Sequence, residues 1–272
     1  MLKIRRSAIV FVLAAALLAV ALPVTSAPPQ TPAVAPAGAK IWLDNPTAFE
    51  DYLKSAEVVS VEELRSGVTR PRKVKVAPGG LFDTFAFKTI QPGRYAGYWE
   101  SYKSEIAAYE MDKLLGLGMV PPTAERRIKS DTGAAVMWAS PTKSFKDLGG
   151  VPGQKGVPGP PAQQAAGWNR QLTRAKMFDD LIGNIDPNLG NWLVDPAWNL
   201  ILIDHTRAFT NTDELYHRLI QVDADLWNKM KALDEPTLTA AIGKWVGKAE
   251  IQAVLLRRDK MQRVVDKLRA GR

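Results

Sequence analysis

Polar and apolar residues alternate in short runs through much of the first half of the chain. Residues 67–76 alternate basic and apolar side chains, and after a Pro-Gly-Gly turn signal the run 85–88 is again strand-like. These two runs predict an antiparallel hairpin that ends on a lysine. A second hairpin is predicted at 124–138, where a Ser-Asp-Thr-Gly turn signal interrupts another alternating pattern.

Helical spacing, in which apolar residues recur every three or four positions, marks other segments. It predicts one helix in the first half, at 105–117, and three in the second half, at 168–183, 213–233 and 249–268. Residues 46–65, which precede them, carry a short helical pattern and the strand-like run 58–61, and these are expected to be the first elements of the N-terminal half. Strands gathered in the first half and helices gathered in the second predict a mixed α+β fold.

Three segments differ in composition from the rest. Residues 1–27 begin with basic residues and continue into an apolar run, and a helix over 8–22 would span only roughly 23 Å of a roughly 30 Å hydrocarbon core. We therefore expect a signal peptide, or an anchor if it stays uncleaved, and a periplasmic or secreted protein. Residues 28–40 predict an extended Pro/Ala-rich tether. The Gly/Pro-rich stretch 150–167 predicts a polyproline-like connector between lobes.

Composition narrows the classes of molecule that the protein is expected to bind. The formal charge is +8, of which Lys3, Arg5 and Arg6 in the leader contribute three, so +5 remains. This balance favours acidic partners such as nucleotides or anionic lipid headgroups, but only weakly. No block of Lys and Arg is interleaved with aromatic residues, so nucleic acid is not an expected partner. The chain has no cysteine, and its two histidines, His205 and His217, do not have a zinc-site spacing.

The segment 249–268 carries a basic outer face, formed by Arg257, Arg258, Lys260 and Arg263. These side chains are expected to be solvated. Weak contact with a membrane surface is the alternative.

The sequence IGNIDPNLGNWLVD at 182–195, followed by LILIDHTRAF at 200–209, carries the strongest chemical signal. It places Asp186 five residues before Asn191, and Asp204 after two apolar runs that predict a hairpin. Such a hairpin would bring Asn191 and Asp204 close together. Phosphoryl transfer needs a carboxylate near the attacking group and oxygen ligands that hold Mg²⁺ on the nucleotide phosphates. The structural alternative is a polar turn that merely connects a helix to a hairpin.

This motif resembles the catalytic and metal-binding segments of the kinase branch that contains the HipA-type kinases, the phosphatidylinositol 3- and 4-kinases and the secretory-pathway casein kinase of the Golgi. The resemblance implies that Asp186 is the catalytic acid/base and that Asn191 and Asp204 are the metal ligands. One departure is that Pro187 and Asn188 stand where an Arg-His pair commonly follows the catalytic Asp.

The resemblance also implies a bilobal arrangement. A small β-rich N-terminal lobe with one helix is expected at 41–149, and a mainly helical C-terminal catalytic lobe at 168–272. A chain of 272 residues is long enough to hold both.

The same resemblance indicates where the nucleotide phosphates bind. A lysine at the end of a strand is usually solvated, but the equivalent residue in this family contacts the phosphates and a helical Glu, so Lys88 is the expected phosphate-binding lysine. Glu105 is its expected partner, because it opens the string E-x-A-A-Y, which also resembles the family. Glu100 and Glu110 are alternatives, and a surface salt bridge is the structural reading for each of the three acids.

The resemblance further implies that the second strand of 124–138 leads into a hinge that binds adenine through backbone groups. The expected positions are Met137 and Ala139. Trp138, between them, is interpreted equally well as a core residue or as a wall of the cofactor site.

Together, the export signal and the resemblance imply an ATP- and Mg²⁺- (or Mn²⁺-) dependent phosphotransferase of the cell envelope or secreted space. Its expected acceptor is a hydroxyl, on a protein rather than on a lipid or small molecule. Two alternatives stay open, namely a pseudokinase that acts as a nucleotide- or metal-binding scaffold, and transfer of another group such as AMP. A periplasm would hold little ATP, which favours the scaffold. Retention of all five polar site residues favours the enzyme.

Overall fold

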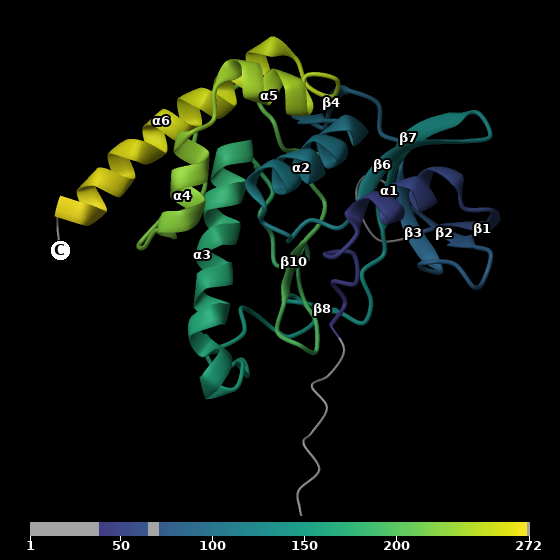
Figure 1. The fold of residues 1–272 in the computed structure, drawn as a ribbon, viewed down its shortest axis with the longest axis horizontal. Coiled ribbons are helices and arrows are strands. Elements are labelled where there is room, and N and C mark those ends of the chain that lie inside the picture. Colours follow the sequence, from purple (N-terminus) through teal and green to yellow (C-terminus); the bar gives the residue numbers. More distant parts are fainter. Residues whose placement is uncertain (1–37, 65–70, 271–272) are drawn as a thin grey trace, which may run out of the picture. The chain divides into compact units, whose positions relative to one another are not determined.

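The computed structural model describes residues 38–64 and 71–270. The predicted signal at 1–27 and the predicted tether up to residue 37 lie outside the described residues. The described residues form the predicted α+β fold, with a strand-rich lobe and a mainly helical lobe (Figure 1). No helix within 38–64 and 71–270 has the length and apolar character that a membrane span requires.

The strand-rich lobe is built on an antiparallel sheet with the strand order β1-β2-β3-β7-β6. The bounds of its strands are β1 Val58–Glu63, β2 Arg72–Val76, β3 Thr84–Lys88, β6 Thr123–Ile128 and β7 Asp131–Met137. Both predicted hairpins are present, since β2 pairs with β3 and β6 with β7. Alternation along the strands buries Val74, Phe85 and Phe87 in one core with side chains of helix α1 (Pro46–Ser55).

Helix α2 (Tyr102–Leu115) joins the two lobes. Ser101 caps its first turn by accepting the Lys103 N–H at 3.0 Å, and Gly116, at φ 58°, ends it in the left-handed conformation that glycine adopts without strain. Ile106 packs against residues of β7, whereas Met111 and Leu115 belong to the core of the helical lobe. The helix therefore lies between both lobes, and it begins at Tyr102 rather than at the predicted Glu105.

The helical lobe contains a small antiparallel sheet in the order β10-β9-β8 and four α-helices. The bounds are β8 Lys143–Ser144, β9 Trp192–Val194, β10 Leu200–Leu202, α3 Ala165–Ile182, α4 Ala224–Lys231, α5 Glu235–Ile242 and α6 Lys248–Ala270, with a short 3₁₀ turn at Ala162–Gln164 before α3. The predicted β9–β10 hairpin is present. A separate hairpin, β4 (Gly93–Tyr95) and β5 (Tyr98–Glu100), precedes α2.

The glycine-rich stretch 150–167 differs from its prediction. Gly153 and Gly156 have φ angles of 85° and 83°, and the Gly153 N–H donates to the Val157 carbonyl at 3.1 Å, so the segment turns back on itself instead of extending as polyproline. It also lies within the helical lobe rather than between lobes. Strand β8, which precedes it, already pairs with β9.

The helix predicted over 213–233 is present only in its last part, as α4. The Asp180 carboxylate accepts the N–H groups of Tyr216 and His217 at 2.8 and 2.9 Å, and these bonds hold the preceding residues in an irregular loop. His217 is therefore not in a helix. A further short helix, α5, was not predicted, although Asp234 caps it by accepting the Thr237 N–H.

The outer face predicted for 249–268 is wrong for one residue. Arg257 on α6 is fully buried, and its guanidinium donates to the carbonyls of Leu181 and Thr210 at 2.9 and 3.0 Å and to that of Thr212. Arg257 thus connects α6 to the end of α3. Arg263 on the same helix is exposed, as predicted.

The predicted tether 28–40 ends in a packed segment. Ala39 is buried, and its N–H donates to Asp195 Oδ2 at 2.7 Å in the turn between β9 and β10. A Cβ atom on Gly38 would lie 2.9 Å from the side chains of Asp195 and Asn199. The folded part of the protein therefore begins no later than Gly38.

Candidate active site

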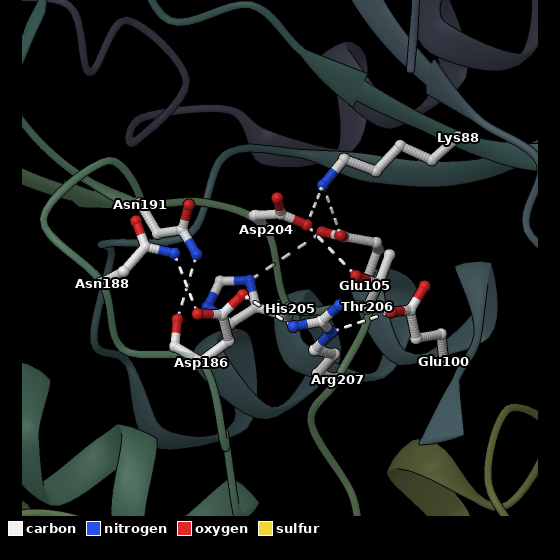
Figure 2. Close-up of polar contacts among 10 residues, drawn as sticks. All are labelled: Lys88, Glu100, Glu105, Asp186, Asn188, Asn191, Asp204, His205, Thr206 and Arg207. Atoms are coloured by element: carbon white, nitrogen blue, oxygen red, sulfur yellow. Dashed lines mark hydrogen bonds and ion pairs between the residues drawn. The ribbon is translucent and has the colours of Figure 1, made fainter. Parts of the chain in front are cut away.

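Lys88 is the centre of a buried ion-pair cluster that joins both lobes (Figure 2). Its Nζ lies 2.6 Å from Glu105 Oε1 on α2 and 2.8 Å from Asp204 Oδ1, which follows β10. The alternation of β3 buries Phe85 and Phe87 in the lobe core, and Lys88 follows at the end of the strand. The structure thus brings together three residues that are far apart in sequence and that the resemblance singled out.

The charges of this cluster stabilise one another. Burial would lower the pKa of the Lys88 ammonium, but attraction to Asp204 and Glu105 outweighs burial and raises that pKa above its ordinary value. Burial would raise the pKa of the Asp204 carboxyl, but Lys88 holds it below its ordinary value. Both groups are therefore charged at neutral pH. Burial lowers the pKa of the neighbouring His205 imidazole, which is consequently neutral.

The other two acids considered as partners of Lys88 have different roles. Glu110 forms a salt bridge with Lys113 on the surface of α2, at 3.0 Å. Glu100, at the end of β5, is buried and pairs with Arg207 at 2.7 Å. Of these three glutamates, Glu105 is thus the one that contacts Lys88.

A cavity of about 280 Å³ opens beside Lys88 and Asp204. Its apolar walls come from both lobes, from Ala86, Val136, Met137, Ala139, Leu193 and Ile203. Met137 and Ala139, the expected hinge positions, are both buried and line it, whereas Trp138 is 39% exposed and also lines it. Mostly apolar walls with a few convergent charges are typical of small-molecule sites, and the volume is near the lower end of their range.

The loop after α3 holds Asp186 in a defined conformation. Gly183, at φ 63°, ends the helix. The Asn191 side-chain nitrogen donates to the Asp186 carbonyl at 3.0 Å, and the Asn188 side-chain nitrogen donates to Asp186 Oδ1 at 2.9 Å (Figure 2). Asn188 thus fixes the direction of one oxygen of the Asp186 carboxylate.

Asn191 and Asp204 are brought close together at the end of the β9–β10 hairpin. The Ile203 N–H donates to the Asn191 carbonyl at 3.0 Å, so Asp204 follows directly after a residue that is bonded to Asn191. Asp204 has φ 63°, a left-handed conformation that is uncommon outside glycine and typical of strained functional positions.

The fit to a divalent cation rests on the donor atoms. A carboxylate and an amide oxygen are hard ligands that suit Mg²⁺ or Mn²⁺. Across the described ranges 38–64 and 71–270, no group of three or more His, Cys, Asp or Glu side chains has a metal-binding arrangement. With Asn191 and Asp204 as ligands, the remaining positions of an octahedral shell would be filled by water or by phosphate oxygens.

Sequence reasoning missed Arg207. Its guanidinium contacts Glu100, lies 3.5 Å from Asp186 Oδ2, and stacks on the Tyr98 ring at 4.6 Å from the ring centroid. The only signal in the sequence is an isolated arginine three residues after Asp204, in a segment that has no other Arg and no Lys.

Comparison with solved structures gives several relatives in fold. The Golgi casein kinase matches with a TM-score of 0.58 and 14% identity, over 85% of this chain and 75% of that chain. The structure of hydra Fam20 with sugar matches with a TM-score of 0.59 and 14% identity, over 82% of this chain and 88% of that chain. The Golgi casein kinase with Mn/ADP bound matches with a TM-score of 0.54 and 13% identity, over 80% and 74%.

No protein-family model and no curated protein matches the sequence. Structural likeness at 13 to 14% identity shows the fold. The chain therefore has a protein-kinase-like fold of the kind found in the Golgi casein kinase.

Proposed function

We propose that this protein is a phosphotransferase that uses ATP with Mg²⁺ or Mn²⁺ and transfers the γ-phosphoryl group to a hydroxyl of a protein. The observation that carries the proposal is Lys88, which lies between Glu105 and Asp204 beside the cavity. A buried ammonium held by two carboxylates is well suited to bind phosphate oxygens. The kinase-like fold supports the same class of reaction.

Each side chain has a role in this proposal. Lys88 binds the nucleotide phosphates while Glu105 orients its ammonium, and backbone groups near Met137 and Ala139 bind adenine. Asn191 and Asp204 hold the divalent cation, which neutralises charge on the phosphates when bound. The Mn/ADP complex of the Golgi casein kinase supports nucleotide and metal as ligands.

Asp186 acts on the acceptor. Its carboxylate orients the acceptor hydroxyl and takes the hydroxyl proton as the new oxygen–phosphorus bond forms and the bond from the γ-phosphorus to the β-phosphate oxygen breaks. ADP is the leaving group. Asn188 keeps one carboxylate oxygen in a fixed direction, which favours a defined attack geometry.

A second cavity, of about 390 Å³, supports the position of the acceptor. It is lined by Ile185, which directly precedes Asp186, and by Tyr98 and Trp99 of strand β5. A hydroxyl entering there would lie next to the loop that carries Asp186. The hydra relative was solved with a sugar, so a sugar hydroxyl is the acceptor to compare with a protein in assays.

Nucleotide is expected to stabilise the protein only together with a divalent cation, because Asn191 and Asp204 act through the metal. A ligand at 100 times its Kd stabilises the native state by about 2.7 kcal/mol, which corresponds to a rise in Tm of roughly 5 to 10 °C for a domain of this size. Thermal scans with ATP, with Mg²⁺ or Mn²⁺, and with both measure it. No rise with the pair would favour the scaffold alternative.

Export is part of the proposal, and it predicts a new N-terminus. Cleavage of the signal at 1–27 should leave a mature chain that retains Gly38 and Ala39, because Ala39 is bonded to Asp195 in the folded protein. Mass spectrometry of the protein from the envelope fraction or medium measures the terminus. A soluble cytoplasmic chain with intact Met1 would contradict export, and it would remove the objection about ATP supply.

A further inference from the structure

The environment of Arg207 is unusual for an arginine close to the protein surface. Its Nε and Nη2 atoms both point to Glu100 Oε1, at 2.8 and 2.7 Å (Figure 2). The Tyr98 ring lies against the guanidinium. Glu100 is 1% exposed, so its charge requires a cation close by. Two contacts of the guanidinium with the β5 strand therefore fix its plane.

The fixed plane directs the remaining nitrogen to the catalytic loop. Nη1 lies 3.5 Å from Asp186 Oδ2, a distance that is long for a hydrogen bond but within ion-pair range. The other carboxylate oxygen, Oδ1, accepts from Asn188. The Asp186 carboxylate is thus approached by a cation on one oxygen and by an amide on the other.

The position of Arg207 matches the departure of this chain from the family pattern. Pro187 and Asn188 follow Asp186, so the loop carries no cation where the pattern has an arginine. We propose that Arg207 is the positioning residue for Asp186, supplying from the segment after Asp204 the cation that the catalytic loop lacks and tying that loop to the β4–β5 hairpin. This inference rests on the proposed function, because it assigns a role within the same transfer reaction.

The simpler explanation is that Arg207 only neutralises Glu100. Changing Arg207 alone would not separate the two, because it would leave an unpaired buried acid and destabilise the fold. The double variant Glu100→Gln/Arg207→Gln removes both charges, and it tests the two explanations because neutralisation is then no longer needed.

The expected result for this double variant is a kcat for transfer that falls about 30- to 100-fold, while the KM for ATP and the metal-dependent rise in Tm stay close to those of the unaltered protein. A displaced carboxylate slows chemistry without touching the nucleotide site. A kcat within twofold of the unaltered protein would overturn the positioning role and leave charge neutralisation as the explanation.

Amide hydrogen exchange provides a readout that does not depend on activity. Residues 184–191 should exchange about tenfold faster in the double variant, because the contact from the loop to the hairpin is lost. If the unaltered protein transfers no phosphate, the proposed function fails, and exchange still decides whether Arg207 holds the loop. Unchanged exchange at 184–191 would then overturn the inference.

The chain offers a matched control. Arg170 on α3 pairs with Asp223 at 2.5 Å, and Asp223 caps α4. The variant Arg170→Gln/Asp223→Asn removes an ion pair that also contains a buried acid, although its arginine is half exposed, and it keeps an N-capping residue, since Asn caps as well as Asp. Both kcat and the exchange at 184–191 should stay within twofold of the unaltered protein. A loss equal to that of the first double variant would show a general effect of weakened folding, against a specific role of Arg207.

Discussion

Asp186→Asn is expected to lower phosphoryl transfer by about 100-fold or more and to leave metal-dependent nucleotide binding unchanged. The substitution keeps the size of the side chain and an oxygen that can accept from Asn188, but it removes the base for the acceptor proton. The metal ligands stay in place. Transfer of radiolabelled γ-phosphate to the protein itself or to a surrogate protein measures the rate, and the rise in Tm with ATP and Mg²⁺ measures binding.

Asp204→Asn is the comparison variant, and it should weaken metal-dependent nucleotide binding itself. It removes a charged ligand of the cation and one of the two carboxylates that contact Lys88, so the rise in Tm with ATP and Mg²⁺ should shrink. If transfer survives Asp186→Asn, or if both variants lose nucleotide binding equally, the roles assigned to the two acids are wrong.

Arg257→Ala is expected to lower the free energy of unfolding by about 3–5 kcal/mol. The guanidinium is fully buried and donates to three backbone carbonyls. The substitution leaves a cavity and carbonyls without a donor, and each such carbonyl costs about 1–3 kcal/mol. Burial lowers the pKa of Arg257 to about 10, which still leaves it charged at neutral pH. A loss of this size is large against a total stability of about 5–15 kcal/mol.

Urea unfolding of the protein measures this loss as a lower urea concentration at the midpoint, with an unchanged dependence of the free energy on urea concentration. Arg263→Ala on the same helix is the matched control, because that side chain is exposed, and it should change stability by no more than about 0.5 kcal/mol. A change below about 1 kcal/mol for Arg257→Ala would contradict the buried position of its guanidinium.

Local patterns predicted those parts of the fold that local physics determines. Alternation predicted the β2–β3 and β6–β7 hairpins, and apolar spacing predicted α3 and α6. The helix predicted over 213–233 was wrong in its first part, because the Asp180 carboxylate, distant in sequence, takes the backbone N–H groups of Tyr216 and His217. Helical spacing contains no information about such a competitor.

In the candidate site, too, local sequence patterns predicted some features, and contacts between residues distant in sequence determined the others. The motif spacing placed Asp186, Asn191 and Asp204 in one region, and the structure brings Lys88 and Glu105 together as expected. The partners of Arg207 and Arg257 could not be predicted, because each arginine contacts groups on elements distant in the chain. A basic residue on an amphipathic helix looks solvated in sequence, and Arg257 is buried because it packs against the end of α3 and the loop after Asp204.

The packing of α2 has a consequence for control of the proposed enzyme. A swing of α2 that carried Glu105 away from Lys88 would expose Tyr109, Met111 and Leu115, which are buried in the core of the helical lobe. Exposing three such side chains costs about 4.5–9 kcal/mol, which is comparable to or larger than the roughly 5.5 kcal/mol that moves a two-state equilibrium from 1:99 to 99:1. We therefore expect no switch that works by swinging this helix. The ion pair between Lys88 and Glu105 should stay assembled, so the activity of the proposed enzyme should be limited by the supply of nucleotide and acceptor.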